Sequence, residues 1–74
     1  MPHVTIQHFP KSLTAEQRFR LVEQVTAAVQ EAFGVEERVV SIALVPVPPE
    51  DWDARVYQPE IAAHREKLAK EPGY

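Results

Sequence analysis

Residues 14–34, TAEQRFRLVEQVTAAVQEAFG, predict one long amphipathic helix. Thr14 and Gln17 have the spacing of a capping box, in which each side chain bonds the backbone N–H of the other residue. Apolar residues then recur every three or four positions, which gathers them on one face of a helix. They are Phe19, Val22, Val25, Val29 and Phe33. Gly34 suits the left-handed backbone that ends many helices, so we expect a helix from about Ala15 to Phe33.

A strand is predicted on each side of this helix. Residues 3–9 alternate with period two and are rich in strand-forming side chains, and Pro10 ends them. Residues 39–45, VVSIALV, are nearly continuously apolar, as in a strand that is covered on both faces or lies at an interface. A strand, a helix and a second strand form a β-α-β unit with parallel strands. The predicted fold class is therefore α/β (α+β).

The residues after the second strand predict a shorter element. Several prolines stop the strand, and Glu50–Asp53 is interpreted as a turn. Pro59 is expected to begin a short polar helix that continues to about Lys70, because proline is favoured in the first turn of a helix. The closing residues, Pro72–Tyr74, are expected to form a loose tail.

The chain of 74 residues is expected to be one domain, residues 1–74, that cannot complete its own core. Domains of this size bury little apolar surface, and without cysteines no disulfide can compensate. Two parallel strands and one helix also leave both sheet edges open. We therefore expect the sheet to be extended by self-association, as a homodimer or a higher homo-oligomer.

Composition excludes several classes of partner. A formal charge of −3 without a Lys/Arg cluster argues against nucleic acid. No apolar run approaches the roughly 20 residues of a membrane span, and no signal peptide is recognisable, so a cytoplasmic protein is expected. His3, His8 and His64 lack accompanying cysteines or clustered carboxylates, so no metal site is predicted.

Pro2 directly follows Met1. Once Met1 is removed, the proline nitrogen is an amine that can take up a proton. An α-amino group titrates at a pKa of about 8 in water, and burial lowers that pKa toward the range where a general base works best. The structural alternative is that Pro2 merely begins an edge strand, where no ladder N–H is needed.

The Pro2–Ile6 start, the long helix, the Val40–Leu44 strand and the Pro49–Trp52 turn together resemble the 4-oxalocrotonate tautomerase superfamily. The chain is most similar to the phenylpyruvate-type tautomerase branch. The residues that carry this closer likeness are His3, Phe9–Lys11, Ser41–Leu44, Trp52 and Pro72–Tyr74. The resemblance implies that Pro2 is a catalytic base, that no cofactor is used, and that active sites lie at subunit boundaries.

The resemblance also implies the substrate-binding residues. Lys11 stands where the family has a carboxylate-binding arginine, and it supplies a point charge instead of a planar fork. Ser41 replaces a second arginine, which favours a monocarboxylate with an apolar tail over a dicarboxylate. Trp52 corresponds to an aromatic wall of the site. Arg55 is a candidate second cation, unless it is a solvated arginine paired with Asp51 or Asp53.

These residues cannot all meet in one subunit. A strand of residues 3–9 spans about 23 Å, so Lys11 lies at the end opposite Pro2. The second strand runs parallel to the first, so the loop that carries Trp52 also begins at that far end. A two-fold axis that pairs two subunits antiparallel would bring the Pro2 end of one to the Lys11 and Trp52 end of the other.

The predicted function is a cofactor-independent keto-enol tautomerase for a small 2-oxo or enol acid with an aryl or apolar tail. One alternative is a hydratase or dehalogenase of unsaturated acids, in which Pro2 stays protonated beside a carboxylate. The candidate carboxylates are Glu36, Glu37, Asp51 and Asp53. Another alternative is an oligomeric binding protein without catalysis, which retention of Met1 would favour.

Overall fold

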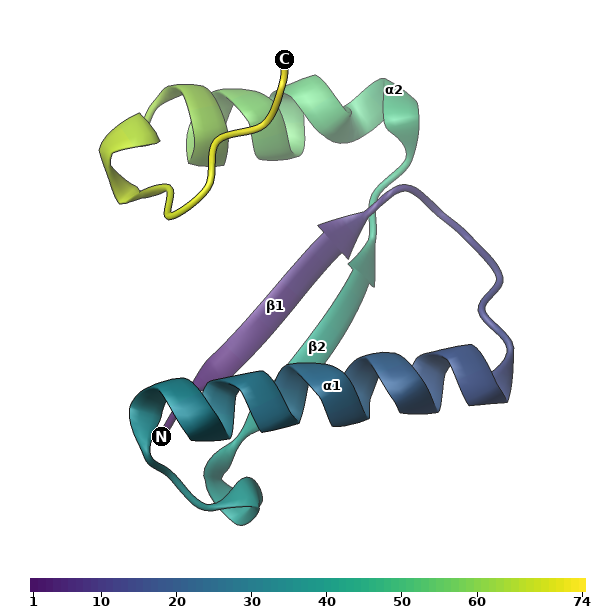
Figure 1. Ribbon diagram of the computed structural model, residues 1–74. Helices are drawn as coiled ribbons and strands as arrows, with labels where there is room; N and C mark the ends of the chain where they lie inside the picture. Colours follow the sequence, from purple (N-terminus) through teal and green to yellow (C-terminus); the bar gives the residue numbers. More distant parts are fainter.

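The computed structural model describes residues 1–74 and contains the predicted β-α-β unit (Figure 1). β1 spans His3–His8 and β2 spans Ser41–Pro46, and the two strands pair in parallel. Helix α1, Ala15–Phe33, connects them. A short 3-10 turn, η1 (Glu37–Val39), precedes β2, so this strand begins later than predicted. The predicted fold class is confirmed.

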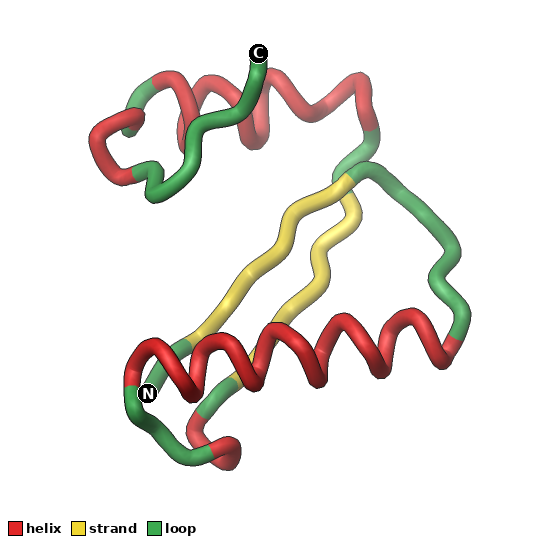
Figure 2. Tube along the Cα trace, viewed as in Figure 1, coloured by secondary structure: helices red, strands yellow, loops and turns green.

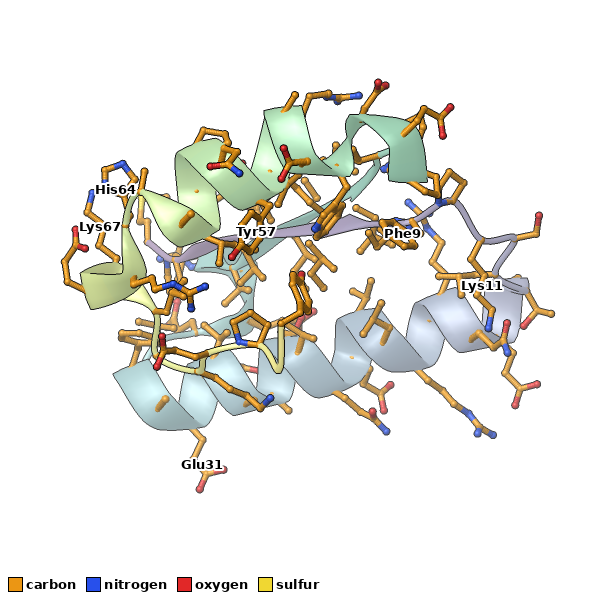
Figure 3. The ribbon with its side chains drawn as sticks, turned by 90° about the horizontal axis from the view of Figure 1, so that it is seen from above. Phe9, Lys11, Glu31, Tyr57, His64 and Lys67 are labelled. Carbon is orange, nitrogen blue, oxygen red and sulfur yellow. The ribbon has the colours of Figure 1, made fainter.

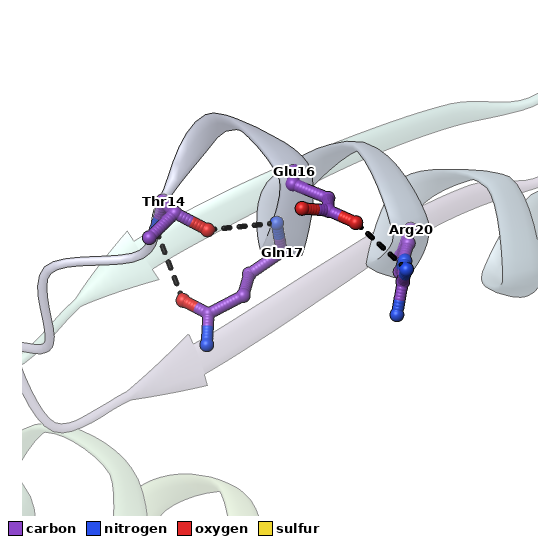
Figure 4. Close-up of polar contacts among 4 residues, drawn as sticks. All are labelled: Thr14, Glu16, Gln17 and Arg20. Carbon is purple, nitrogen blue, oxygen red and sulfur yellow. Dashed lines mark hydrogen bonds and ion pairs between the residues drawn. The ribbon is translucent and has the colours of Figure 1, made fainter.

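Helix α1 has the bounds that its end signals predict. The Thr14 hydroxyl accepts a bond from the Gln17 N–H at 3.0 Å, and the Gln17 side chain accepts one from the Thr14 N–H at 3.0 Å (Figure 4). Gly34 adopts φ 65° and ψ 41°, and its N–H donates to the Gln30 carbonyl at 2.8 Å. Both ends are fixed by contacts within a few residues, which is why sequence alone predicts them.

The C-terminal helical segment begins earlier than expected. Helix α2, Pro49–Trp52, runs directly into the π-helix η2, Asp53–Ala62, and a 3-10 turn, η3 (Arg65–Lys67), follows. The predicted turn at Glu50–Asp53 and the predicted helix start at Pro59 are therefore wrong. Pro49 takes the first-turn position that suits proline, whereas Pro59 lies inside the wider winding of η2.

The strands run between α1 on one side and the α2–η2 segment on the other (Figures 1 and 3). Side chains of β1 alternate between these two sides, as a strand requires. Ile6 lines a hollow together with Leu21 of α1. The Gln7 side chain donates to the Glu60 carboxylate at 2.7 Å and so connects β1 to η2. Figure 2 shows the final residues as a loop that folds back along this segment.

Very little of the single chain is buried. Val47, directly after β2, and Val56, in η2, are the only residues that solvent barely reaches. Large apolar side chains remain exposed, namely Met1, Phe9, Leu13, Phe19, Val22, Phe33 and Tyr74. No helix combines the length and apolar character needed to cross a bilayer. The fold therefore has the incomplete core that its length predicts.

Candidate active site

Pro2 lies just before β1 and is partly buried. Its carbonyl accepts the Ser41 N–H at 3.2 Å, so the parallel ladder begins at Pro2 itself. Pro2 lines a hollow of about 430 Å³, whose apolar residues include Val4, Val29 and Phe33. We name this hollow the Pro2 hollow. Met1 also lines this hollow, and Phe33 is 70% exposed in the single chain, so the hollow is open to solvent.

The residue after Pro2 is held by a side-chain hydrogen bond across the two strands. His3 Nδ1 and Ser41 Oγ are 2.6 Å apart, and Thr5 Oγ1 lies 3.4 Å from His3 Nε2. Ser41 cannot provide the positive charge that the family's arginine would bring. In this chain it instead fixes the side chain that adjoins Pro2.

Lys11 lies beyond the end of β1 and lines a hollow of about 460 Å³ that also includes Arg18 of α1. Neither cation forms an ion pair, and no carboxylate lines this hollow. We name it the cationic hollow. Sequence reasoning missed Arg18, although its position in the first turns of α1 puts it next to the loop that carries Lys11.

Trp52, the last residue of α2, packs against Phe9 at the far end of β1. The two rings meet edge to face, with centroids 5.2 Å apart and planes at 86°. They line a hollow of about 580 Å³ together with Tyr74, and its surface is almost wholly apolar. We name it the aromatic hollow. Phe9 and Tyr74 were not predicted as lining residues.

Arg55 does not line any of these three hollows. Its guanidinium Nη1 lies 3.8 Å from the Asp51 carboxylate, one turn earlier in the same segment, and both side chains are about half exposed. This geometry matches the alternative stated above for Arg55, a solvated arginine paired with a neighbouring aspartate. In the single subunit its charge is thus already partnered.

The closing residues, Pro72–Tyr74, form no helix or strand, and contacts are made at both ends of residues 71–74. Arg65 donates to the Glu71 carboxylate at 3.1 Å and to the Tyr57 hydroxyl at 3.1 Å. These hydrogen bonds raise the pKa of the Arg65 guanidinium above its ordinary value, and the bond to Glu71 contributes more than the bond to Tyr57. The Tyr57 and Tyr74 rings lie 5.8 Å apart. We call these contacts of Tyr57, Arg65 and Glu71 the tail clasp.

The structure therefore brings Phe9, Lys11 and Trp52 to one end of the molecule and leaves Pro2 at the other. In Figure 1 the N-terminus lies at the start of β1, and α2 begins beyond the strand ends. Figure 3 labels Phe9 and Lys11, which lie toward the same end of the strands. The six residues of β1 alone span about 20 Å. A single subunit does not join Pro2 to the other candidates.

The chain is a small β-α-β protein with a proline ahead of its first strand and with cationic and aromatic hollows beyond it, which fits a small isomerase. Residues 2–56 match the family model described as "Tautomerase enzyme", and the chain belongs to this family. Relatives named "Tautomerase PptA" align with the whole chain and with 97% of their own length. The Klebsiella pneumoniae protein is 42% identical, that of Enterobacter sp. strain 638 is 39% identical, and that of Pectobacterium atrosepticum is 38% identical. The predicted tautomerase class is confirmed.

Proposed function

We propose that this tautomerase interconverts the enol and keto forms of a small 2-oxo acid with an aryl or apolar tail, with Pro2 as its general base. The main support is the position of Pro2. The family match begins at this residue, and Pro2 lines the largely apolar Pro2 hollow. An amine in such surroundings is more easily kept neutral than one in water.

The proposed reaction moves one proton within the substrate. Neutral Pro2 accepts the proton of the enol hydroxyl and leaves an enolate. The carbonyl forms as the electrons of the carbon–carbon double bond take that proton back at the neighbouring carbon, and Pro2 is neutral again. This scheme needs no cofactor. Lys11 would bind the carboxylate, with Arg18 beside it, and Trp52 would shape the pocket for the tail.

The proposed site is shared between two subunits. The Ser41 N–H donates to the Pro2 carbonyl, and the Val47 N–H donates to the His8 carbonyl. The backbone N–H and C=O groups of the even-numbered residues of β1 therefore point toward β2. The backbone groups of Thr5 and Gln7 therefore point to the open edge of β1. The open edge of β2 is a poorer partner, because Pro46 has no N–H there. Antiparallel pairing of two β1 edges would bring Pro2 of one subunit to the Lys11 end of the other.

The hydration or dehalogenation alternative has less support. It requires a carboxylate near a protonated Pro2. Within one subunit no carboxylate lines the Pro2 hollow, so the carboxylate would have to come from the partner, in which Asp51 and Asp53 flank Trp52. Of the four candidates, Glu36 is held by Arg38 at 2.7 Å and Asp51 lies beside Arg55 at 3.8 Å. Keto-enol tautomerisation remains the function that the arrangement supports best.

The ketonisation of phenylenolpyruvate, followed by ultraviolet absorbance, tests this function. Intact mass must first establish that Met1 has been removed, because only then is the Pro2 nitrogen an amine. We expect a rate well above that of the buffer. A rate equal to the buffer's would contradict tautomerisation of aryl enol acids and favour the non-catalytic alternative.

Replacing Lys11 is expected to weaken substrate binding more than it slows the chemical step. Lys11→Ala should raise KM roughly tenfold with kcat nearly unchanged, because the lost charge holds the carboxylate equally in the substrate and in the transition state. Steady-state kinetics measure this effect. Lys11→Arg is the matched control and should retain a near-normal KM. An unchanged KM in Lys11→Ala would exclude Lys11 from the site.

A further inference from the structure

Three aromatic rings from separate parts of the chain meet in the aromatic hollow. Phe9 follows β1, Trp52 ends α2, and Tyr74 comes from the closing residues. The hollow has a volume of about 580 Å³, is lined almost wholly by apolar atoms and is open to solvent in the single chain. Aromatic rings favour edge-to-face and offset contacts, and the Phe9–Trp52 pair already shows the first kind. A flat aryl group therefore suits this hollow.

The ring of Tyr74 lies next to the tail clasp. Arg65 holds Glu71 and Tyr57 at 3.1 Å each, and the Tyr57 ring lies against that of Tyr74. Figure 3 shows Tyr57 on the C-terminal helical segment, over the strands. The hydrogen bond of Glu71 and the ring contact of Tyr74 thus connect both ends of residues 71–74 to the C-terminal helical segment.

Phe9 belongs to two hollows. Besides the aromatic hollow it lines a smaller one of about 240 Å³, and Lys11 is among the other residues of that smaller hollow. A ligand with its aryl group between Phe9, Trp52 and Tyr74 could therefore direct a carboxylate toward Lys11. A 2-oxo acid with an aryl tail has this combination of an apolar end and an anionic end.

We propose that Tyr74 is a specificity-determining residue that, with Phe9 and Trp52, forms the subsite for the aryl tail of the substrate. This inference rests on the proposed function, since it concerns the substrate of the same site. Tyr74 is 64% exposed and Phe9 52% exposed in the single subunit, so both rings retain apolar surface for a ligand to cover. The tail clasp positions Tyr74 and takes no part in the chemistry.

The test compares a long and a short substrate in one assay. Enolisation exchanges the C3 protons of phenylpyruvate and of 2-oxobutanoate for deuterium in D₂O, and NMR measures both rates. For Tyr74→Ala we expect KM for phenylpyruvate to rise roughly tenfold while 2-oxobutanoate is unaffected. Tyr74→Phe, which keeps the ring, is the matched control and should behave like the unmodified protein.

Binding provides a second readout, because Trp52 is the only tryptophan. Its fluorescence should report 3-phenylpropanoate, a probe that cannot enolise, with a Kd that rises in Tyr74→Ala in parallel with KM. Equal effects on both substrates, or none, would overturn the Tyr74 inference. A changed oligomer size would also overturn it and assign Tyr74 to a contact between copies. Exchange of neither substrate by the unmodified protein would instead contradict the proposed function itself.

Discussion

One additional glycine in front of Pro2 is expected to abolish tautomerase activity. Acylation turns the Pro2 nitrogen from an amine into an amide, which cannot accept a proton at working pH. General-base catalysis contributes about 10²- to 10⁴-fold, so the loss should be at least of that order. Ketonisation of phenylenolpyruvate measures it. The extended chain should keep its helical circular dichroism and its oligomer size, because the Pro2 carbonyl and the Ser41 N–H remain able to bond.

Pro2→Ala is the complementary variant. After Met1 removal it retains a terminal amine but loses the rigid ring beside Val4, Val29 and Phe33. We expect kcat/KM to fall less than in the extended chain, since a primary amine can still accept a proton. An extended chain with normal activity would refute a role for the Pro2 nitrogen, whatever the behaviour of Pro2→Ala.

The second large effect is expected at the open edge of β1. Thr5→Pro should dissociate the oligomer and remove most of the activity together with much of the helical signal. Proline removes the Thr5 N–H that faces this edge, and the separated chain buries only Val47 and Val56. Sedimentation velocity should show a species at least twice as heavy as the 8.4 kDa chain for the unmodified protein but not for the variant.

Thr5→Val is the matched control for this variant. Both substitutions remove the hydroxyl that lies 3.4 Å from His3, but only proline removes the edge N–H. Thr5→Val should therefore remain assembled and active. An unmodified protein that sediments as an active single chain would contradict the shared site, and with it the antiparallel pairing of β1.

The parts of the fold that sequence predicts well are those fixed by near neighbours. Thr14 and Gln17 cap each other across one turn, and Gly34 takes the left-handed backbone for which glycine is suited. The helix bounds in the second half of the chain were harder to predict. Proline suits the first turn of a helix, but this preference does not show which of several prolines begins one. Pro49 and Pro59 both fit that rule, and only Pro49 begins a helix.

Some residues of the candidate site could be predicted from sequence, and others are recognised only in the folded chain. Pro2, Lys11 and Trp52 could be named from sequence because they coincide with positions of a known family. The contact between Phe9 and Trp52, and that of Tyr57 with Tyr74, join residues that only the folded chain brings together. Arg18 was missed for a related reason. A charge on an amphipathic helix looks solvated until the neighbouring loop is in position.

Arg55 was named from sequence as a candidate second cation, and in the single subunit it lies beside an aspartate instead of in one of the three hollows. Its spacing after Trp52 made it a candidate second cation, but the helix that replaces the predicted turn sets it one turn from Asp51. The predicted turn at Glu50–Asp53 would have allowed the chain to fold back and bring Arg55 toward the site. A continuous helical segment instead pairs it along its own surface.

The pH dependence of kcat/KM for phenylenolpyruvate, measured on protein whose Met1 removal is established by intact mass, tests the role of Pro2 most directly. If neutral Pro2 is the base, lowering the pH protonates the amine and activity is lost. The rate should therefore rise with pH through the pKa of the amine and then level off. A rate that instead falls as pH rises through this range would show that protonated Pro2 is required, which would contradict the general-base account and support hydration chemistry.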